Sequence, residues 1–375
     1  MRKKILILTE AGDLHAYAIA EALRRKGSEP VLWHTSDFPS QSSESVLFEG
    51  CEERLQVDAP GLALREADFN TFSTVWRRRP SQVLPLHLLH PADHKFVESE
   101  CNIFRRALFG LVSCNSFWVN PLAAATAAGS KLTQHRCARN CGLTLPDTLY
   151  SNDPGEIRRF LVRHGGEIVY KTFRGVSWRD AETYWAPYTS LLTEEKLVAD
   201  ELLAATPGIY QALVPKDYEL RVTVMGRKVF AAKIFSQVTS AGRLDWRKAY
   251  NELRMVPCSL PAAIEEQSLA LIESSGLVFG CLDFIVSPSG EHYFLEVNEM
   301  GQFLFVESFT GLPLLDAFTE FLAQGTVDFA WEETPSSLRY SDVQEAAERT
   351  VAEMVQTHVN PPEHAVWDGK DLPPA

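Results

Sequence analysis

The sequence predicts a mixed α/β (α+β) protein with several domains, and three observations lead to this prediction. The chain opens with a strand, helix and strand pattern, formed by residues 4–8 (KILIL), 16–26 and 30–34 (PVLWH). Several strand-like runs follow between residues 167 and 297. The length of 375 residues is enough for two or three domains, each with its own core.

The opening pattern lacks the turn that binds a dinucleotide. Only Gly12 follows the first strand, where a G-x-G-x-x-G sequence would be needed. We therefore expect a scaffold or partner-binding role for this region. Gly27 is expected to end the first helix, short strands are expected over 50–80, and a further helix is expected over 96–112.

The centre of the chain is predicted to begin with a connection and a helix. The alanine-rich sequence WVNPLAAATAAGSK is interpreted as a link between domains, with a boundary near residue 125, and not as part of a core. A helix is expected over 132–141, where Gly142 closes it. A strand is expected at EIVYKTF.

The later part of the chain is rich in predicted strands, at GIYQALV, ELRVTVMG, KVFAAKIFS, GCLDFIVSPSG and EHYFLEV. The last two runs predict a hairpin, because residues 288–290 carry turn signals. A helix over 260–276 is expected to pack behind them. A final amphipathic helix is expected over 341–355, with Ser341 as its N-cap, after a linker at 334–337.

Composition and charge argue against several classes of protein. The formal net charge of -13 argues against a broad nucleic-acid surface, which is normally basic. The apolar run after MRKK is too short for a signal peptide, and no run approaches the roughly 20 apolar residues of a membrane-spanning helix. Seven scattered cysteines indicate reduced thiols. We therefore expect a cytoplasmic protein that binds neither nucleic acid nor membrane.

Three oxygen-bearing side chains are predicted to meet on the last hairpin. Asp283 lies on its first strand, and Glu296 and Asn298 share one face of its second strand, because strand side chains alternate. Burying a carboxylate among apolar residues without a charge partner is costly. Oxygen ligands of this kind suit a hard cation such as Mg²⁺, which keeps water and phosphate oxygens in its shell. The hairpin is therefore a candidate metal site that a nucleotide would complete.

Two lysines could supply the positive charge that a phosphate chain needs. Lys131 precedes a predicted helix, and Lys171 ends the strand EIVYK among apolar neighbours. Each lysine alone is more typical of a surface residue whose stem covers apolar neighbours. Their value as candidates lies in their combination with the acidic residues of the hairpin.

Other candidate groups have weaker signals. His87, His90 and His94 could suggest a metal site, but Pro91 interrupts any single helix that would align them. Cys137 and Cys141 would lie one helical turn apart but lack a matching second pair. The basic sequence WRRRP could bind phosphate or an acidic peptide, or it could be a solvated turn.

Together these motifs resemble the ATP-grasp ligases over about residues 120–325. The resemblance rests, in chain order, on Lys131 with GLTLPDT, VYKTF around Lys171, YQALVPKDYELRVTVMGRKVFAAKI and GCLDFIVSPSGEHYFLEVNEMGQFLFVE. More narrowly, the sequences WRRRP, WVNP, SNDP, AAKIFSQ, DWR and GQFLFVE…TGLP resemble the microviridin-type peptide-modifying ligases, or graspetide synthetases.

The resemblance implies an ATP-grasp fold with an N-terminal Rossmann-like pre-ATP-grasp domain. That α/β domain would cover residues 1–122, and a small central subdomain would cover 123–205. A C-terminal subdomain with the Mg-ATP site would cover 206–330, and a helix and tail would cover 331–375.

The resemblance also implies roles for single residues, with ATP and Mg²⁺ as cofactors. The phosphates would be contacted by Lys131 and Lys171. The hinge beside the adenine edge would be formed by Gln211, Ala212, Leu213 and Val214. The Mg²⁺ ions would be held by Asp283, Glu296 and Asn298. The transferred phosphoryl group or the substrate carboxylate would be steadied by Arg221, Arg247 and, as a third candidate, Lys233.

The chain departs from the family pattern in two places. Where the family has Pro-Asn-Gly-Gln after its Glu-x-Asn pair, this chain has Glu299, Met300, Gly301 and Gln302. The loop after Lys171, RGVSW, has one glycine where nucleotide-covering loops often have several. The first departure makes Glu299 and Met300 the residues expected to affect substrate choice.

The function implied by the resemblance is ADP-forming ligation of a carboxylate to an amine or hydroxyl group through an acyl phosphate. The expected partner is a ribosomally made precursor peptide, with a leader and an acidic, hydroxyl-rich core, in which the enzyme closes ester or amide macrocycles. Because dimers are common in this family, a homodimer is a further expectation. One alternative is a RimK-like ligase that adds free amino acids to a peptide, protein or metabolite. Another is a non-catalytic nucleotide-binding sensor or scaffold.

Overall fold

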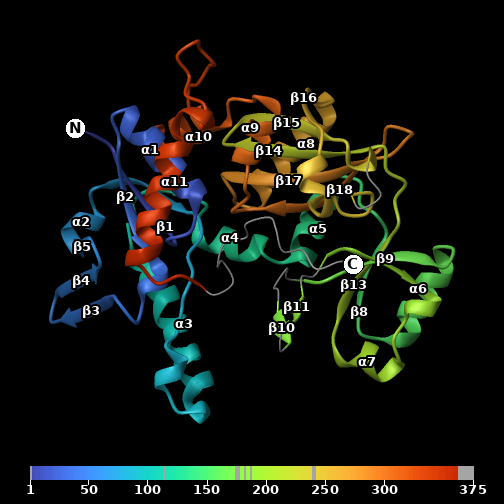
Figure 1. Cartoon of the computed structure of the whole chain (residues 1–375), viewed down its shortest axis with the longest axis horizontal. Helices are drawn as coiled ribbons and strands as arrows, with labels where there is room; N and C mark the ends of the chain where they lie inside the picture. The colour runs from blue at the N-terminus through green and yellow to red at the C-terminus, as the bar shows by residue number, and fades with distance from the viewer. Residues whose placement is uncertain are drawn as a thin grey trace.

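The structure is a computed structural model that describes residues 2–113, 115–173, 178–180, 183–185, 188–238 and 242–361, with 178–180, 183–185 and 249–251 described as backbone alone. The elements form separate sheets that lie side by side in Figure 1, with the first and last helices together at one end. The loop RGVSW, whose single glycine departs from the family pattern, lies outside the described residues except for the backbone of its last residue.

The N-terminal sheet is parallel, with strand order β2-β1-β6-β7. Its strands are β1 (Lys4–Thr9), β2 (Glu29–His34), β6 (Phe72–Arg77) and β7 (Phe117–Val119). Helix α1 (Leu14–Arg25) connects β1 to β2, so the predicted strand, helix and strand opening is confirmed. Its apolar residues are buried, and Gly27 follows the helix with a φ of 84°, a conformation that favours glycine at a helix end.

Helices from the far end of the chain cover this sheet. Helix α1 packs against α10 (Leu314–Gln324) and α11 (Tyr340–Thr357), and Figure 1 shows the red α11 beside the blue α1. The shared core includes Trp76 of β6 and Phe318 of α10, whose rings meet edge to face. The two ends of the described chain are therefore joined by apolar burial.

A small antiparallel sheet and a long helix extend from the N-terminal region. The sheet has the order β3-β4-β5, and its members are β3 (Ser43–Glu49), β4 (Glu52–Ala59) and β5 (Leu62–Arg65). Four short helical elements accompany it: η1 (Thr35–Asp37), α2 (Glu66–Phe69), η2 (Leu86–Leu88) and η3 (Pro91–Asp93). The long helix is α3 (His94–Leu111), which confirms the helix predicted over 96–112.

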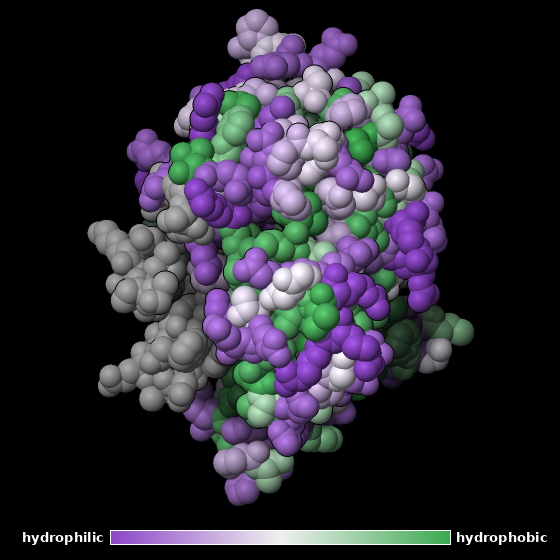
Figure 2. All heavy atoms as spheres, turned by 90° about the vertical axis from the view of Figure 1, so that its right-hand side faces the viewer, coloured by the Kyte–Doolittle hydropathy of each residue, from purple (hydrophilic) through white to green (hydrophobic). Residues whose placement is uncertain are grey.

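A four-stranded sheet with the order β12-β9-β13-β8 forms the central part. Its strands are β8 (Thr148–Ser151), β9 (Glu167–Lys171), β12 (Ser190–Thr193) and β13 (Gly208–Ala212). Helices α6 (Pro154–Arg163) and α7 (Asp200–Ala205) and the turn η4 (Glu194–Lys196) accompany it, together with a hairpin of β10 (Trp178–Asp180) and β11 (Thr183–Trp185). The side of the molecule that carries this sheet mixes apolar patches with polar ones (Figure 2).

A five-stranded antiparallel sheet with the order β16-β15-β14-β17-β18 follows. Its strands are β14 (Tyr218–Met225), β15 (Lys228–Ile234), β16 (Met255–Cys258), β17 (Phe279–Val286) and β18 (His292–Asn298). The hairpin predicted from turn signals at 288–290 is confirmed, because β17 and β18 pair and Gly290 has a φ of 83°. The connections include η5 (Ser236–Val238) and η6 (Trp246–Glu252).

The two faces of the five-stranded sheet belong to different cores. One face, with Val222 and Phe284, packs against α5 (Lys131–Asn140) and α8 (Ala262–Ser274), the helix predicted behind the hairpin. The other face, with Phe279 and Cys281, packs against α9 (Leu304–Thr310) and α10. A side chain on β14, β15 or β17 is therefore assigned to one face by its register.

Two expectations about local structure were wrong. The alanine-rich stretch is a helix, α4 (Leu122–Ala128), and its Ala125 and Ala128 are buried in the core, because small side chains let the helix approach its neighbours closely. Ser341 lies inside α11, whose N-cap is Arg339. Asp342, in the first turn, accepts a hydrogen bond from the N–H of this N-cap residue at 2.7 Å.

The remaining expectations concern membranes and metals. No helix in the described part of the chain is long and apolar enough to cross a membrane. His87, His90 and His94 do not form a metal-binding group in the described structure. Cys137 and Cys141 both lie within hydrogen-bonding distance of the Ser274 hydroxyl, at 3.1 and 3.3 Å.

Asn120 of the WVNP sequence ties two strand ends together. Its Oδ1 accepts hydrogen bonds from the N–H groups of Val278 and Phe279 at 2.8 and 2.9 Å. Its Nδ2 donates to the carbonyl groups of Phe279 and Glu299 at 2.9 and 2.8 Å. This buried amide joins the start of β17 to the loop that follows β18.

We expect Asn120→Ala to lower the free energy of unfolding by about 2–4 kcal/mol, because each buried polar group left without a partner costs about 1–3 kcal/mol. Urea unfolding followed by circular dichroism measures the change. The matched control is Asn152→Ala, which removes one exposed amide bonded to the Ala204 carbonyl. That variant should lose less than about 1 kcal/mol, and equal losses in the two variants would contradict the role given to Asn120.

Candidate active site

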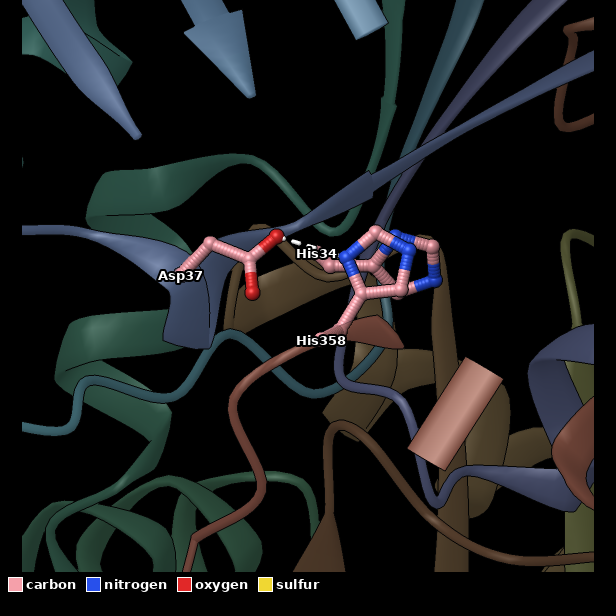
Figure 3. Close-up of side chains that lie close together, drawn as sticks. All are labelled: His34, Asp37 and His358. Carbon is pink, nitrogen blue, oxygen red and sulfur yellow. Dashed lines mark hydrogen bonds and ion pairs between the residues drawn. The ribbon is translucent and has the colours of Figure 1, made fainter. Parts of the chain in front are cut away.

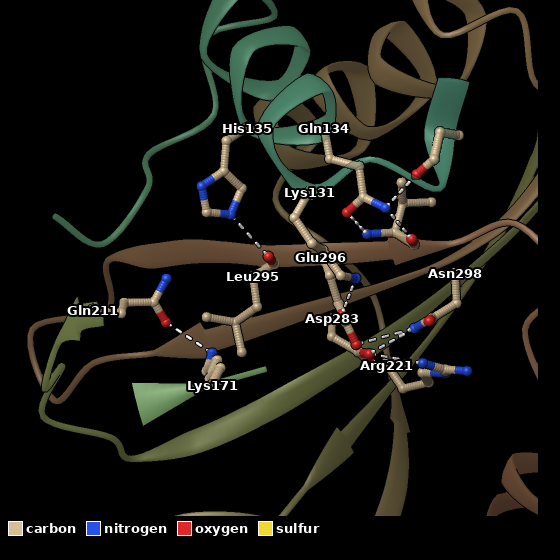
Figure 4. A network of polar contacts seen from close by, with 12 residues as sticks. Lys131, Gln134, His135, Lys171, Gln211, Arg221, Asp283, Leu295, Glu296 and Asn298 are labelled. Carbon is tan, nitrogen blue, oxygen red and sulfur yellow. Dashed lines mark hydrogen bonds and ion pairs between the residues drawn. The ribbon is translucent and has the colours of Figure 1, made fainter. Parts of the chain in front are cut away.

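The three predicted metal ligands meet across the β17–β18 hairpin. Asp283 is the register partner of Glu296, and Cys281 is the register partner of Asn298. The amide nitrogen of Asn298 donates to Asp283 Oδ2 at 3.2 Å and to Glu296 Oε1 at 3.3 Å. The expectation that these three side chains share one face is therefore confirmed, and Figure 4 shows them pointing toward one another.

A β-bulge in β18 produces this arrangement. The register shifts beside Asp283, so Phe284 pairs with Phe294, Asp283 pairs with Glu296, and Leu295 is an extra residue between them. Phe294 and Val297 are both buried in the core although they are three positions apart. Regular alternation would have placed Glu296 on the same face as Phe294. The bulge moves it to the other face.

Helix α5 holds the bulged strand by side-chain contacts to its backbone. Gln134 accepts a hydrogen bond from the Val297 N–H at 3.1 Å and donates to the Val297 carbonyl at 2.9 Å. The ring nitrogen Nε2 of His135 lies 3.2 Å from the carbonyl oxygen of Leu295, the bulge residue. Lys131 precedes Gln134 by three positions and His135 by four, so the three side chains lie on one face of α5. The Lys131 ammonium group forms an ion pair with Glu296.

The charges of the two carboxylates are balanced by nearby cations. Burial opposes ionisation of Glu296, but Lys131 and Lys171 outweigh burial and hold the pKa of this carboxyl group well below its ordinary value. Burial and the charge of Glu296 raise the pKa of Asp283, while Arg221 acts in the opposite direction. The Arg221 guanidinium donates to both oxygens of Asp283 at 2.9 and 2.8 Å.

Arg221 also reaches the loop after the hairpin. Its Nη2 donates to the Gln302 carbonyl at 2.8 Å, and its side chain is 7% exposed. Among the described residues its buried Nε has no hydrogen-bond partner. A buried guanidinium with a spare N–H suits an anionic ligand such as a phosphate or a carboxylate.

Lys171 and the expected hinge lie next to each other on two paired strands. Lys171 is the last residue of β9, and its Nζ donates to Gln211 Oε1 at 2.8 Å. Burial lowers the pKa of Lys171, although nearby carboxylates oppose this shift. Gln211 and Ala212 end β13, whereas Leu213 and Val214 lie in the connection to β14. The four hinge residues thus pass from the strand into a connection beside the lysine.

The three predicted basic residues have different positions. Arg221 lies on the Asp283 face. Arg247 of η6 is 53% exposed and donates to both oxygens of Asp245. The pKa of Arg247 is raised mainly by Asp245, and more weakly by Glu296 and Asp283. Lys233 pairs with Leu220 on the opposite face of the sheet, and its Nζ lies 4.3 Å from the centre of the Tyr218 ring. The structure therefore brings Arg221 and Arg247 toward the carboxylates, but not Lys233.

Sequence reasoning missed several residues that position the site. Gln134 and His135 were not singled out, although their spacing from Lys131 places them on one helix face. From WRRRP, Arg78 donates to the Met300 carbonyl at 2.5 Å and pairs with Asp13 in the N-terminal region. No sequence spacing could show this contact, because Arg78 and Met300 are 222 residues apart.

The residues of the hairpin fit a hard divalent cation. Asp283 and Glu296 offer carboxylate oxygens, and a half-turn of the Asn298 amide would present its oxygen to the same point. Lys131 and Lys171 lie close enough to Glu296 to lower the pKa of its carboxyl group. Cationic side chains and oxygen ligands that share one site are suited to a nucleotide phosphate chain with its Mg²⁺.

Comparison with known proteins places this geometry in a structural context. No family model and no curated protein matches the chain. A RiPP-associated ATP-grasp ligase from Chryseobacterium gregarium, solved with ADP and a leader and core peptide, is 26% identical. Its TM-score is 0.77, over 88% of this chain and 98% of that one.

Two proteins from Microcystis aeruginosa MRC are similar as well. The macrocyclase MdnC, solved with the precursor peptide MdnA, is 27% identical with a TM-score of 0.74, over 86% of this chain and 100% of that one. The macrocyclase MdnB is 29% identical with a TM-score of 0.70, over 85% of this chain and 99% of that one. The structure thus confirms the ATP-grasp fold of this chain and its resemblance to the microviridin-type peptide-modifying ATP-grasp ligases.

Proposed function

We propose that this protein is an ADP-forming ligase that uses ATP and Mg²⁺ to activate a side-chain carboxylate of a peptide. The activated carboxyl group is joined to a hydroxyl or amine side chain of the same peptide, which closes an ester or amide macrocycle. The observation that carries the proposal is the meeting of Asp283, Glu296 and Asn298 with the ammonium groups of Lys131 and Lys171.

In this proposal the nucleotide lies between the central sheet and the hairpin. Lys131 and Lys171 bind its phosphates, and residues 211–214 bind the adenine edge from the end of β13. Asp283, Glu296 and Asn298 hold Mg²⁺, which neutralises charge on the phosphates when it is bound. The contact between Lys171 and Gln211 supports this placement, because it sets the phosphate-binding ammonium group beside the hinge.

The proposed ligation has two steps. A carboxylate oxygen of the substrate attacks the γ-phosphorus of ATP, so that an acyl phosphate forms and ADP leaves. The hydroxyl or amine group then attacks the acyl carbon and loses its proton, and inorganic phosphate leaves. Arg221 would stabilise the negative charge in both steps through its Nε–H, which has no hydrogen-bond partner among the described residues.

Two observations support a peptide as the substrate. The similar ligase from Chryseobacterium gregarium was solved with a leader and core peptide, and MdnC was solved with a precursor peptide. In this chain Val162 of α6, Val198 just before α7 and Leu202 of α7 are exposed apolar side chains, at 76, 48 and 60%. The ion pair of Arg158 with Asp200 joins these two helices. Exposed apolar side chains that lie close together are suited to a peptide partner.

The product mass tests the reaction. A short peptide rich in Glu, Asp, Ser, Thr and Lys, encoded beside the gene for this chain, would be incubated with the enzyme, ATP and Mg²⁺. We expect one ADP released and one water lost from the peptide for each bond formed. A mass gain with added free amino acids would instead show the amino-acid-adding ligase. Nucleotide binding without ADP release from any candidate peptide would show the sensor.

Removing one proposed metal ligand should stop turnover. We expect Glu296→Gln to lower the rate of ADP release by about 100-fold or more, because it removes the charge of a central ligand. The matched control is Glu291→Gln on the same hairpin, which contacts the Tyr293 hydroxyl in solvent. It should keep near-normal activity. Activity retained by a folded Glu296→Gln enzyme would contradict the metal assignment.

Substitution of two lysines tests whether ATP binding depends on the position of Lys171 or only on the net charge of the protein. We expect Lys171→Met to raise the Kd for ATP about 10–100-fold, because a charge-assisted hydrogen bond worth about 1.5–3 kcal/mol is lost. Lys233→Met makes the same chemical change on the opposite face of the five-stranded sheet and should leave the Kd unchanged. Calorimetric titration with an ATP analogue measures both values. A larger effect at Lys233 would contradict this assignment.

A further inference from the structure

A buried group of three side chains joins the N-terminal sheet to the end of the last helix. His34 ends β2, Asp37 lies in the turn η1, and His358 directly follows α11. Each offers one potential ligand atom, and these atoms lie within 4.8 Å of one another. His34, Asp37 and His358 are 7, 0 and 7% exposed. Figure 3 shows the two rings close together beside the carboxylate.

The contacts of the group are polar and close. His358 Nδ1 lies 2.7 Å from Asp37 Oδ2, across 321 residues of sequence. The Val359 N–H donates to the other oxygen of Asp37 at 2.9 Å. The His34 and His358 ring centres are 3.7 Å apart. The Tyr17 hydroxyl lies 2.8 Å from His34 Nε2, so that within the described part of the chain His34 Nδ1 is the nitrogen left for another ligand.

The charge balance of this group differs from that of the candidate active site. Asp37 is fully buried, and among the described residues no lysine or arginine forms an ion pair with it, since its only ion-pair partner is His358. A buried carboxylate without a permanent counter-charge is costly. Two imidazoles and one carboxylate that converge from distant segments offer a bound cation both neutralisation and ligands.

We propose that His34, Asp37 and His358 form a binding site for a divalent transition-metal ion, with Zn²⁺ as the best-suited cation. Imidazole nitrogen with carboxylate oxygen suits Zn²⁺, whereas Mg²⁺ prefers oxygen ligands alone. Three protein ligands leave the fourth tetrahedral position to water. The ion replaces the hydrogen bond between His358 and Asp37, and the rings turn so that their nitrogens point to one centre.

Tyr17 takes part as a positioning residue. A histidine that binds a metal through one nitrogen usually donates the N–H of the other to a fixed acceptor, and such partners strengthen metal binding. The Tyr17 hydroxyl is placed to accept that bond from His34 Nε2. Because α1 carries Tyr17 and packs against α11, one bound ion connects β2, α1 and the end of α11.

Zinc titration of the full-length protein tests the proposal. Protein without a histidine tag is stripped with a chelator and titrated with Zn²⁺ against a chromophoric competitor. We expect one tightly bound ion per chain and a rise in Tm with bound Zn²⁺. Asp37→Asn and His358→Gln should lose both effects, whereas the exposed control His87→Gln should keep both. Circular dichroism checks the folding of each variant.

Two further variants distinguish this site from Zn²⁺ binding elsewhere in the chain. Glu296→Gln should keep the Zn²⁺ stoichiometry, which shows that the ion is not held at the proposed nucleotide site, so the test is independent of the proposed function. Tyr17→Phe keeps all three ligands and should weaken Zn²⁺ binding about 10–100-fold. This variant still tests the site if His358→Gln fails to fold. The proposal is overturned if wild type does not bind Zn²⁺, or if Asp37→Asn binds it equally well.

Discussion

The candidate site depends on one extra residue in an edge strand. Phe294 and Val297 both point into the core behind the five-stranded sheet, and a regular strand cannot place residues three apart on one face. The bulge at Leu295 resolves this conflict and turns Glu296 and Asn298 toward Asp283. Apolar burial on one side of the strand and three oxygen ligands on the other are therefore consequences of the same distortion.

A bulge leaves backbone groups without strand partners, and α5 supplies substitutes. His135 contacts the carbonyl of Leu295, and Gln134 contacts both backbone groups of Val297. Because the same helix face carries Lys131, the contacts that hold the strand also bring an ammonium group to Glu296. Structural support and charge are coupled here, so a change that moved α5 would also move the lysine.

The sequence was sufficient for the fold class, the opening strand-helix-strand unit, the final hairpin and the common face of Glu296 and Asn298. Those features depend on apolar periodicity and turn residues, which are local. Three others depend on packing that no local pattern encodes: the bulge at Leu295, the face on which Lys233 lies, and the meeting of Asp37 with His358 across the fold. Ser341 shows the same limit at small scale, since the helix begins one residue before it and Arg339 is the N-cap.

The departure from the family pattern after β18 can be understood from backbone contacts. Arg78 binds the Met300 carbonyl, Asn120 binds the Glu299 carbonyl, and Arg221 binds the Gln302 carbonyl. Any residue type offers a carbonyl, so these three contacts do not require a Pro-Asn sequence. The side chains at 299 and 300 are then free to differ.

The side chains at 299 and 300 both affect Arg77. Arg77 lies 3.3 Å from the Met300 sulfur. Burial lowers the pKa of Arg77, while the charge of Glu299 opposes this shift. The Met300 side chain therefore contacts the N-terminal region, and the charge of Glu299 acts on the same arginine.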